Sequence, residues 1–258
     1  MNLTEQREAI HHLVDETNPA DASAIYYAFH HPADKVQLTI FPPDSLRSLG
    51  YVCSAMTGID LFRPLVTMRL PLDEPGQEPI YAESLDLIYH AVPTGGSVII
   101  STTSAYYPLL SAVFTIHREE RVKLLVLDPK LFSPIINVLV AESSSHNDLP
   151  RFVIRQNDKS SASGLGDTIA SAGINWQSSS YAEIYVHTKN HFRRQGMGSS
   201  VVSYVVQRIL DSGRTPLYGI SANNDPSYQL ARSVGFFDSG IEEIHVEGTL
   251  NTRPGSSL

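Results

Sequence analysis

The sequence predicts an α/β protein, with a mixed sheet that carries helices on both faces in the C-terminal half and a second α/β half before it. Three observations lead to this fold class. Short runs rich in β-branched residues alternate with amphipathic helical segments. A basic, glycine-punctuated turn joins one such run to a helix at residues 193–198. The chain has 258 residues, enough for one large domain or two smaller ones.

The first half contains a strand–helix–strand unit between Ser97 and Leu127, which makes it α/β. Apolar residues at helical spacing open the chain, and Asp21 is the expected N-cap of a second helix. Runs of β-branched residues between turn residues mark the strands. The expected helices are 3–15, 21–30, 80–91 and 105–114; the expected strands are 35–41, 51–56, 65–70, 97–101 and 122–127, with a loop at 71–79.

The second half begins with a hairpin and ends with alternating strands and helices. Its longest helix, 193–212, repeats valine and isoleucine at spacings of four and is followed by Gly213. Asn224 or Asp225 is expected to cap the last helix, with Pro226 in its first turn. The expected strands are 135–141, 151–156, 168–176, 182–188, 216–221 and 241–246, and the helices are 193–212 and 224–234. A polar stretch at 158–166 and a frayed tail at 249–258 complete the chain.

The composition excludes several classes of protein. A formal net charge of −8 argues against general nucleic-acid binding. The single cysteine, Cys53, excludes a disulfide within the chain. No signal-peptide pattern and no apolar run of about 20 residues is visible, so we expect a cytoplasmic protein that does not contact membranes. Ten histidines are present, but neighbouring ones point about 100° apart on a helix and no HExxH spacing occurs, so no metal is expected.

The turn Arg193-Arg194-Gln195-Gly196-Met197-Gly198 predicts an anion site. Glycines let the backbone approach an anion closely and leave N–H groups pointing outward. The positive end of the following helix and the two arginines would add to the attraction. This turn is therefore expected to hold a phosphate or pyrophosphate group.

Two features that follow the turn make the pattern more specific. Asn224-x-x-Ser227 begins the next helix, and Gly235-Phe236 closes it. Together with Arg193-x-x-Gly196-x-Gly198 between a strand and a helix, this order resembles the GNAT superfamily, the acyl-CoA-dependent N-acyltransferases, over residues 135–250. The resemblance implies the GNAT fold, an acetyl-CoA cosubstrate and an amine acceptor.

The resemblance also implies a set of cofactor-binding residues. In the family, the strand before the turn bonds the pantetheine arm through its backbone, the turn binds the pyrophosphate, and the later Asn contacts the arm. The residues at these positions here are Val186, His187, Thr188, Arg193, Arg194, Gln195, Gly196, Met197, Gly198, Ser199 and Asn224. Asn224 also suits an N-cap, and the two roles are compatible. A dinucleotide site would need a glycine where Val201 stands.

Acyl transfer needs a base for the amine and a proton for the leaving thiolate. The resemblance makes Glu183 the candidate base, but counting from the turn puts it one residue out of phase unless a bulge intervenes. Many members have a tyrosine where this chain has Ala231, and Tyr228, one turn earlier, is the candidate substitute. A structural or substrate-positioning role stays open for Glu183, helix packing for Tyr228, and catalysis for His187. Trp176 could wall the acceptor site or fill the core.

We therefore expect an accessory α/β domain at 1–133, as a degenerate copy of the same fold without a CoA loop, and a GNAT-like domain at 134–258. The predicted function is N-acetyl transfer from acetyl-CoA to an amine by direct attack in a ternary complex. A non-catalytic acyl-CoA-binding sensor and an unrelated anion-binding α/β protein are the alternatives. The sequence does not identify the amine, and it leaves a homodimer open.

Overall fold

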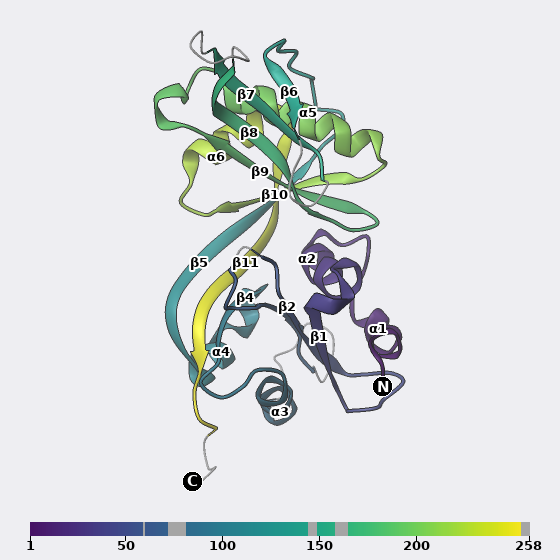
Figure 1. Ribbon diagram of the computed structural model, residues 1–258. Coiled ribbons are helices and arrows are strands. Elements are labelled where there is room, and N and C mark those ends of the chain that lie inside the picture. The colour runs from purple at the N-terminus through teal and green to yellow at the C-terminus, as the bar shows by residue number, and fades with distance from the viewer. Residues whose placement is uncertain (59, 72–80, 144–148, 158–164, 254–258) are drawn as a thin grey trace. The chain divides into compact units, whose positions relative to one another are not determined.

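The computed structural model describes residues 1–258 except 59, 72–80, 144–148, 158–164 and 254–258 (Figure 1). The expected loop at 71–79 therefore lies outside the described residues, apart from Pro71. The same holds for the polar stretch up to residue 164 and for the last five residues of the tail. Among the described helices, none is both long and apolar enough to cross a lipid bilayer.

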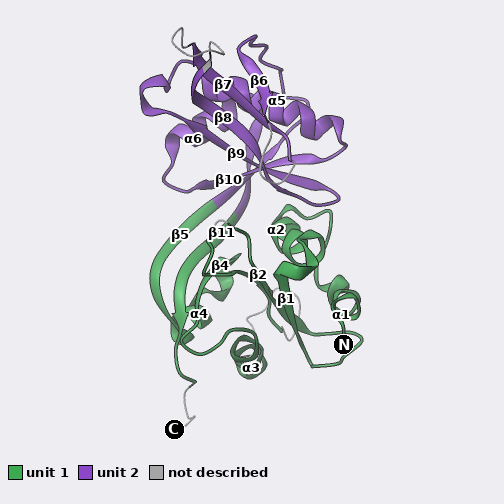
Figure 2. Ribbon diagram, viewed as in Figure 1, with its two compact units in different colours: residues 1–122, 242–258 green, residues 123–241 purple. Residues whose placement is uncertain are grey.

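The chain forms two compact units (Figure 2). The first comprises Met1–Val122 and Glu242–Leu258, and the second comprises Lys123–Ile241. Residues 242–258, which the sequence analysis assigned to the second half, belong to the first unit because their strand pairs with residues 97–103. The predicted domain division at 133/134 stays a proposal.

In the first unit, the described strands follow the order β1-β2-β3-β4-β11, and the start of β5 lies next to β11. Only β3 and β4 are parallel among the pairs of this order. Its strands are β1 (Val36–Phe41), β2 (Gly50–Ala55), β3 (Leu65–Arg69), β4 (Ser97–Thr103) and β11 (Phe236–Leu250), the last of which begins in the second unit. Its α-helices are α1 (Leu3–Ile10), α2 (Ala22–Ile25), α3 (Tyr81–Ala91) and α4 (Tyr107–Val113), and α2 continues as a π-helical turn at Tyr26–His30.

Asp21 is not the side-chain cap that the sequence suggested. It precedes α2 without a capping hydrogen bond, and its carboxylate instead pairs with the guanidinium of Arg69. Asn18 caps the preceding 3₁₀ turn, since its side chain accepts from the N–H of Ala20 at 3.0 Å. An ion pair that is mostly removed from solvent therefore decides the role of Asp21.

The second unit contains the mixed sheet that the sequence predicted. Its strand order is β5-β10-β9-β8-β7-β6. Strands β6 to β9 form antiparallel pairs, whereas β9 and β10 are parallel. The strands are β5 (Phe114–Leu127), which begins in the first unit, β6 (Val140–Ser143), β7 (Arg151–Asn157), β8 (Leu165–Gln177), β9 (Tyr181–Thr188) and β10 (Thr215–Ser221). The helices are α5 (Met197–Asp211) and α6 (Asp225–Val234).

The first strand of the predicted hairpin is shorter than expected. Residues 135–139 precede β6 and are bonded to side chains of α5 rather than to a strand. Ser203 Oγ accepts from the N–H of Ile135 at 2.8 Å, and the hydroxyl of Tyr204 donates to the carbonyl of Asn137 at 3.2 Å. The β-branched composition of this stretch misled the strand prediction, because its backbone hydrogen bonds are made elsewhere.

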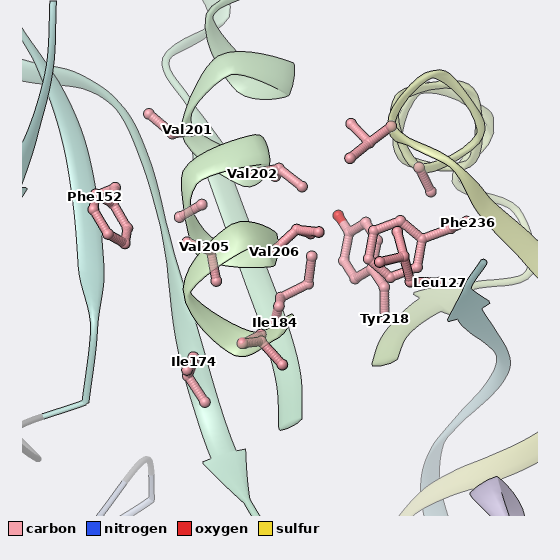
Figure 3. Packing of buried hydrophobic residues seen from close by; sticks show 14 of the residues in the cluster. Leu127, Phe152, Ile174, Ile184, Val201, Val202, Val205, Val206, Tyr218 and Phe236 are labelled. Carbon is pink, nitrogen blue, oxygen red and sulfur yellow. The ribbon is translucent and has the colours of Figure 1, made fainter. Parts of the chain in front are cut away.

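The core of this unit lies between the sheet and α5 (Figure 3). Val201, Val205 and Val206 are fully buried on α5, and they pack in one cluster with Ile174 of β8 and Ile184 of β9. Valine is a modest helix former, so packing of this apolar stripe, rather than intrinsic propensity, stabilises α5. The valine repeat therefore fixes where α5 lies on the sheet.

Truncating one of these valines should destabilise the second unit selectively. We expect Val206→Ala to lower the free energy of unfolding by about 2–3 kcal/mol, from lost burial plus a cavity. Trp176, the only tryptophan and a buried residue of this unit, provides the fluorescence signal for denaturant unfolding. Val138→Ala is the matched control, because Val138 is 93% exposed and should change stability by less than about 0.5 kcal/mol. Equal losses for both variants would contradict this account of the core.

Candidate functional site

The parallel strands β9 and β10 separate early. Their ladder joins only three residue pairs, of which Leu217↔Glu183 is the last. Strand β9 continues to Thr188 and β10 continues to Ser221. Beyond the last pair, the backbone groups of β9 that point toward β10 therefore have no ladder partner there.

A cavity of about 680 Å³ adjoins this separation. It is lined by the end of β9 (residues 186–188), by the turn before α5 with the start of that helix, and by the start of α6. Its size is that of a site for a cofactor-sized molecule. Of the predicted cofactor-binding residues, those that line it are Val186, His187, Thr188, Arg193, Arg194, Gly196, Gly198, Ser199 and Asn224. Gln195 and Met197 do not line it, and Met197 packs against the core.

The turn before α5 leaves the start of the helix open. Gly196 is the N-cap at φ 74°, a left-handed conformation that glycine adopts without strain. Having no side chain, it cannot cap, and the first helical bond runs from the N–H of Ser200 to the carbonyl of Gly196 at 3.0 Å. The N–H groups of residues 197–199 therefore lack partners within the helix. The helix starts at Met197, four residues later than predicted, because Arg194 (φ 59°) and Gly196 leave the right-handed region.

Gly198 allows the start of α5 to lie close to its neighbours. A Cβ atom there would stand 2.8 Å from Cδ1 of Leu230 on α6 and 3.2 Å from Oγ1 of Thr188 on β9. A side chain at position 198 would therefore have to displace the end of Leu230 and press against Thr188. The second glycine of the turn thus brings three elements together at the wall of the cavity.

The cations of the turn differ in what they contact. Arg193 Nε donates to the carbonyl of Thr188 at 3.2 Å, which ties the turn to the end of β9. Gln195 Nε2 donates to the carbonyl of His191, also at 3.2 Å. Arg194 is exposed, and the described residues give its guanidinium no ion pair. Arg193 is therefore part of the scaffold, and Arg194 is available to an anion in the cavity.

The start of α6 forms the opposite wall. Oδ1 of Asn224 accepts from the N–H of Ser227 at 3.2 Å, which confirms the predicted N-cap and leaves Nδ2 as a donor. Ser227 lines the cavity, and its side chain lies close enough to the phenol of Tyr218 on β10 to affect the pKa of that phenol. Burial raises the pKa of the Tyr218 phenol, the nearby Ser227 side chain opposes that shift, and the charge of Glu183 adds to it. Sequence reasoning missed Tyr218, because an apolar strand gives no sign that one residue reaches a neighbouring helix.

Glu183 lies on the sheet face that points away from α5. Its neighbours Ala182 and Ile184 belong to the core beneath α5, so alternation turns Glu183 to the other side. The register shift anticipated near this residue is in the adjacent strand, where Ile174↔Ile184 is followed by Trp176↔Glu183. The residue skipped there, Asn175, donates from Nδ2 to Oε2 of Glu183 at 3.0 Å. Trp176 thus faces Glu183 across the strands rather than joining the α5 core.

Tyr228 and Ala231 lie outside the cavity lining, whereas His187 belongs to it. Tyr228 packs against the core, and Nζ of Lys123 lies 6.0 Å from its ring centroid. Ala231, at the position where the family has tyrosine, is fully buried. His187 is exposed on the face of Glu183. Within the described part of the chain, no three His, Cys, Asp or Glu side chains form a group that could hold a metal.

Comparisons with known proteins agree with this geometry. Residues 163–244 match the family model described as FR47-like protein. A GCN5-related N-acetyltransferase from Kribbella flavida is 17% identical with a TM-score of 0.59, covering 94% of this chain and 98% of that one. A GCN5-related N-acetyltransferase-like protein from Streptococcus suis is 12% identical with a TM-score of 0.60, covering 96% and 100%. The chain has the GNAT fold.

A tandem GNAT protein from the clavulanic acid biosynthesis pathway is also similar, at 10% identity and a TM-score of 0.58, covering 98% of this chain and 95% of that one. This likeness fits an architecture of two halves. Among curated proteins, none matches the sequence. At these identities the comparisons establish the GNAT fold, and the chemistry has to be argued from the residues of this chain.

A side chain placed at the left-handed N-cap should strain the backbone by a measurable amount. We expect Gly196→Ala to lower the free energy of unfolding by about 1 kcal/mol, because a Cβ is disfavoured at this φ although it would contact nothing within 4 Å. Gln195→Ala, the neighbouring exposed residue, is the control and should change stability by less than about 0.5 kcal/mol. Denaturant unfolding followed by Trp176 fluorescence measures both. An unchanged or higher stability for Gly196→Ala would rule out the strain.

Proposed function

We propose that this protein transfers an acetyl group from acetyl-CoA to an amine by direct attack in a ternary complex. The observation that carries the proposal is the cavity where β9 and β10 separate, walled by an uncapped start of α5. A pyrophosphate suits this place, because N–H groups, the helix dipole and the guanidinium of Arg194 all favour negative charge. The coarser conclusion, a GNAT fold suited to acyl transfer, is independent of the residue assignments below.

The pantetheine arm would lie along the end of β9. Residues 186–188 line the cavity, and their backbone groups on the β10 side have no ladder partner. Nδ2 of Asn224 faces the same space from α6 and could donate to an amide carbonyl of the arm. An arm bound in this way would run toward the last ladder pair, Leu217↔Glu183. The thioester would then be presented beside Glu183.

The reaction removes two protons from nitrogen and adds one to sulfur. Glu183 would accept the proton that an ammonium acceptor must lose before its nitrogen attacks the thioester carbon. The C–N bond forms, and the C–S bond breaks as the tetrahedral intermediate collapses. The nitrogen then loses its second proton, and the sulfur gains one, so the products are an amide, a thiol and one released proton. Acyl transfer of this kind needs no metal or further cofactor.

For the proton on sulfur, we propose Tyr218 acting through Ser227 in place of Tyr228. Ser227 lines the cavity and lies near the phenol of Tyr218, whereas Tyr228 packs toward Lys123. Because burial raises the pKa of Tyr218 above its usual value of about 10, the phenol stays protonated at neutral pH. It can therefore supply a proton to a thiolate and is restored from solvent or from the amine.

Acetyl-CoA binding should depend on Arg194. We expect acetyl-CoA at millimolar concentration to raise the melting temperature of the protein. Arg194→Ala should weaken the affinity about tenfold, through loss of a charge-assisted contact, and the difference should shrink as salt increases. Arg232→Ala is the matched control, because this exposed arginine lies on α6 outside the cavity lining. No stabilisation of the unmodified protein by acetyl-CoA would overturn the proposed cofactor and favour an unrelated anion-binding protein.

Turnover with a panel of amines tests the chemistry. We expect Glu183→Gln to reduce kcat by about 10²–10⁴-fold and Tyr218→Phe by about 10-fold or more, with acetyl-CoA affinity retained. Tyr228→Phe, a matched change on α6, should leave kcat within about twofold. The activity of the unmodified enzyme should not fall between pH 8 and about 9.5 from loss of the Tyr218 proton, because its pKa is raised. Binding without turnover of any amine would instead favour a non-catalytic sensor.

A further inference from the structure

The sheet face that carries Glu183 also carries Arg151, and the Nε donor of this arginine has no hydrogen-bond acceptor among the described residues. Strand alternation places Phe152 and Ile154 of β7 in the α5 core, which turns Arg151 to the opposite face. The register Arg151↔Gly173↔Tyr185 then aligns three strands in one row on that face. Glu183 is two residues from Tyr185 and therefore points to the same side.

Gly173 leaves room for a side chain to lie across this row. A Cβ atom there would stand 2.7 Å from the hydroxyl of Tyr185 and 2.9 Å from Cε1 of its ring. The ring of Tyr185 therefore lies over β8, with its hydroxyl between β9 and β7. Arg151 and Tyr185 therefore share this face on the two strands that flank Gly173, and β7 and β9 are about 10 Å apart across β8.

Arg151 lacks a partner that its burial would normally require. Its Nε is buried, and no described residue accepts a hydrogen bond from it. Arginine presents its donors in a planar fork that matches a carboxylate in two-point contact. Nearly all buried donors in proteins have an acceptor, so an unused Nε on the acceptor face points to an anionic group that arrives with a ligand.

Resting on the proposed function, we infer that the acceptor is an amine that also carries a carboxylate, as in a free amino acid. Arg151 binds the carboxylate, with the hydroxyl of Tyr185 beside it. Glu183, in the next row of the same face and oriented by Asn175, receives the amine. Trp176, paired across from Glu183, forms a wall for the side chain. Opposite charges at the two ends of the site match the two charges of such an acceptor.

The test measures binding separately from turnover. The probes are leucine, phenylalanine and lysine, each compared with the amine that lacks only the carboxylate: isopentylamine, phenethylamine and cadaverine. Calorimetry on the CoA-bound full chain gives affinities, and acetylation assays give kcat/KM. We expect at least one carboxylated probe to be preferred tenfold or more over its counterpart, in both measurements where turnover occurs.

Arg151→Gln should remove this preference by weakening the carboxylated probe tenfold or more, while its counterpart changes by less than twofold. Arg151→Lys keeps the charge but not the planar fork of donors, so its preference for the carboxylated probe should lie between those of the unmodified protein and Arg151→Gln. Unchanged thermal stabilisation by acetyl-CoA shows that both variants are folded.

The outcomes separate this inference from the proposed function. Preferential binding of carboxylated probes without acetyl transfer would sustain the Arg151 site and sink the enzyme activity. Acetylation of amines without any preference for the carboxylate would sustain the activity and overturn the site. Equal losses for both members of a pair in Arg151→Gln would also overturn it, because they indicate a structural role.

Discussion

The early end of the β9–β10 ladder is the constraint on which the second unit's site depends. Two parallel strands that stayed paired would use their backbone groups on each other and close the space between them. Here the pairing stops at Leu217↔Glu183, and each strand is held beyond that point by something else. Strand β9 remains paired with β8 as far as Thr188. Strand β10 leads into α6, whose start is fixed by Asn224. The separation of β9 from β10 is thus maintained by the pairing of β9 with β8 and by the connection of β10 to α6.

The valine stripe of α5 supports the same arrangement from behind. It fixes the helix on the sheet through buried contacts with β8 and β9, so the start of α5 is held beside the end of β9. Gly198 then permits contact with Thr188 and Leu230 at distances that a side chain would not allow. The anion-attracting N–H groups are therefore positioned by core packing, while the turn itself stays exposed. Gly198 serves packing, whereas the neighbouring residues of the exposed turn supply the N–H groups and positive charge.

Local patterns predicted the parts of the site that are made by backbone. The glycines of the turn, the N-cap Asn224 and the order of strands and helices each carry a signal within a few residues, and the structure has them. Local patterns could not predict contacts between elements that are distant in the sequence. The bulge at Asn175 that accompanies Glu183, and the contact between Tyr218 and Ser227, join segments that are distant in sequence. Of the strand predicted at residues 135–141, the first five residues are not in a strand for the same reason, since their hydrogen bonds go to α5. Helical spacing suggested Tyr228 but could not show that its ring lies near Lys123, and its catalytic role stays a prediction.

The first unit offers an internal comparison for the separated strands. Strands β3 and β4 are also parallel, and their ladder joins only the pairs Leu65↔Ile99 and Val66↔Ile100. Just beyond β3, however, the N–H of Leu70 donates to the hydroxyl of Tyr106, which follows β4, at 3.2 Å. A buried tyrosine thus satisfies a backbone group at the position where the second unit leaves such groups facing a cavity. A degenerate copy of the fold would be expected to look this way, because an unsatisfied amide that no longer meets a ligand costs about 1–3 kcal/mol. On this argument the first unit keeps the strand separation as architecture, whereas the proposed function makes it the binding site of the second unit.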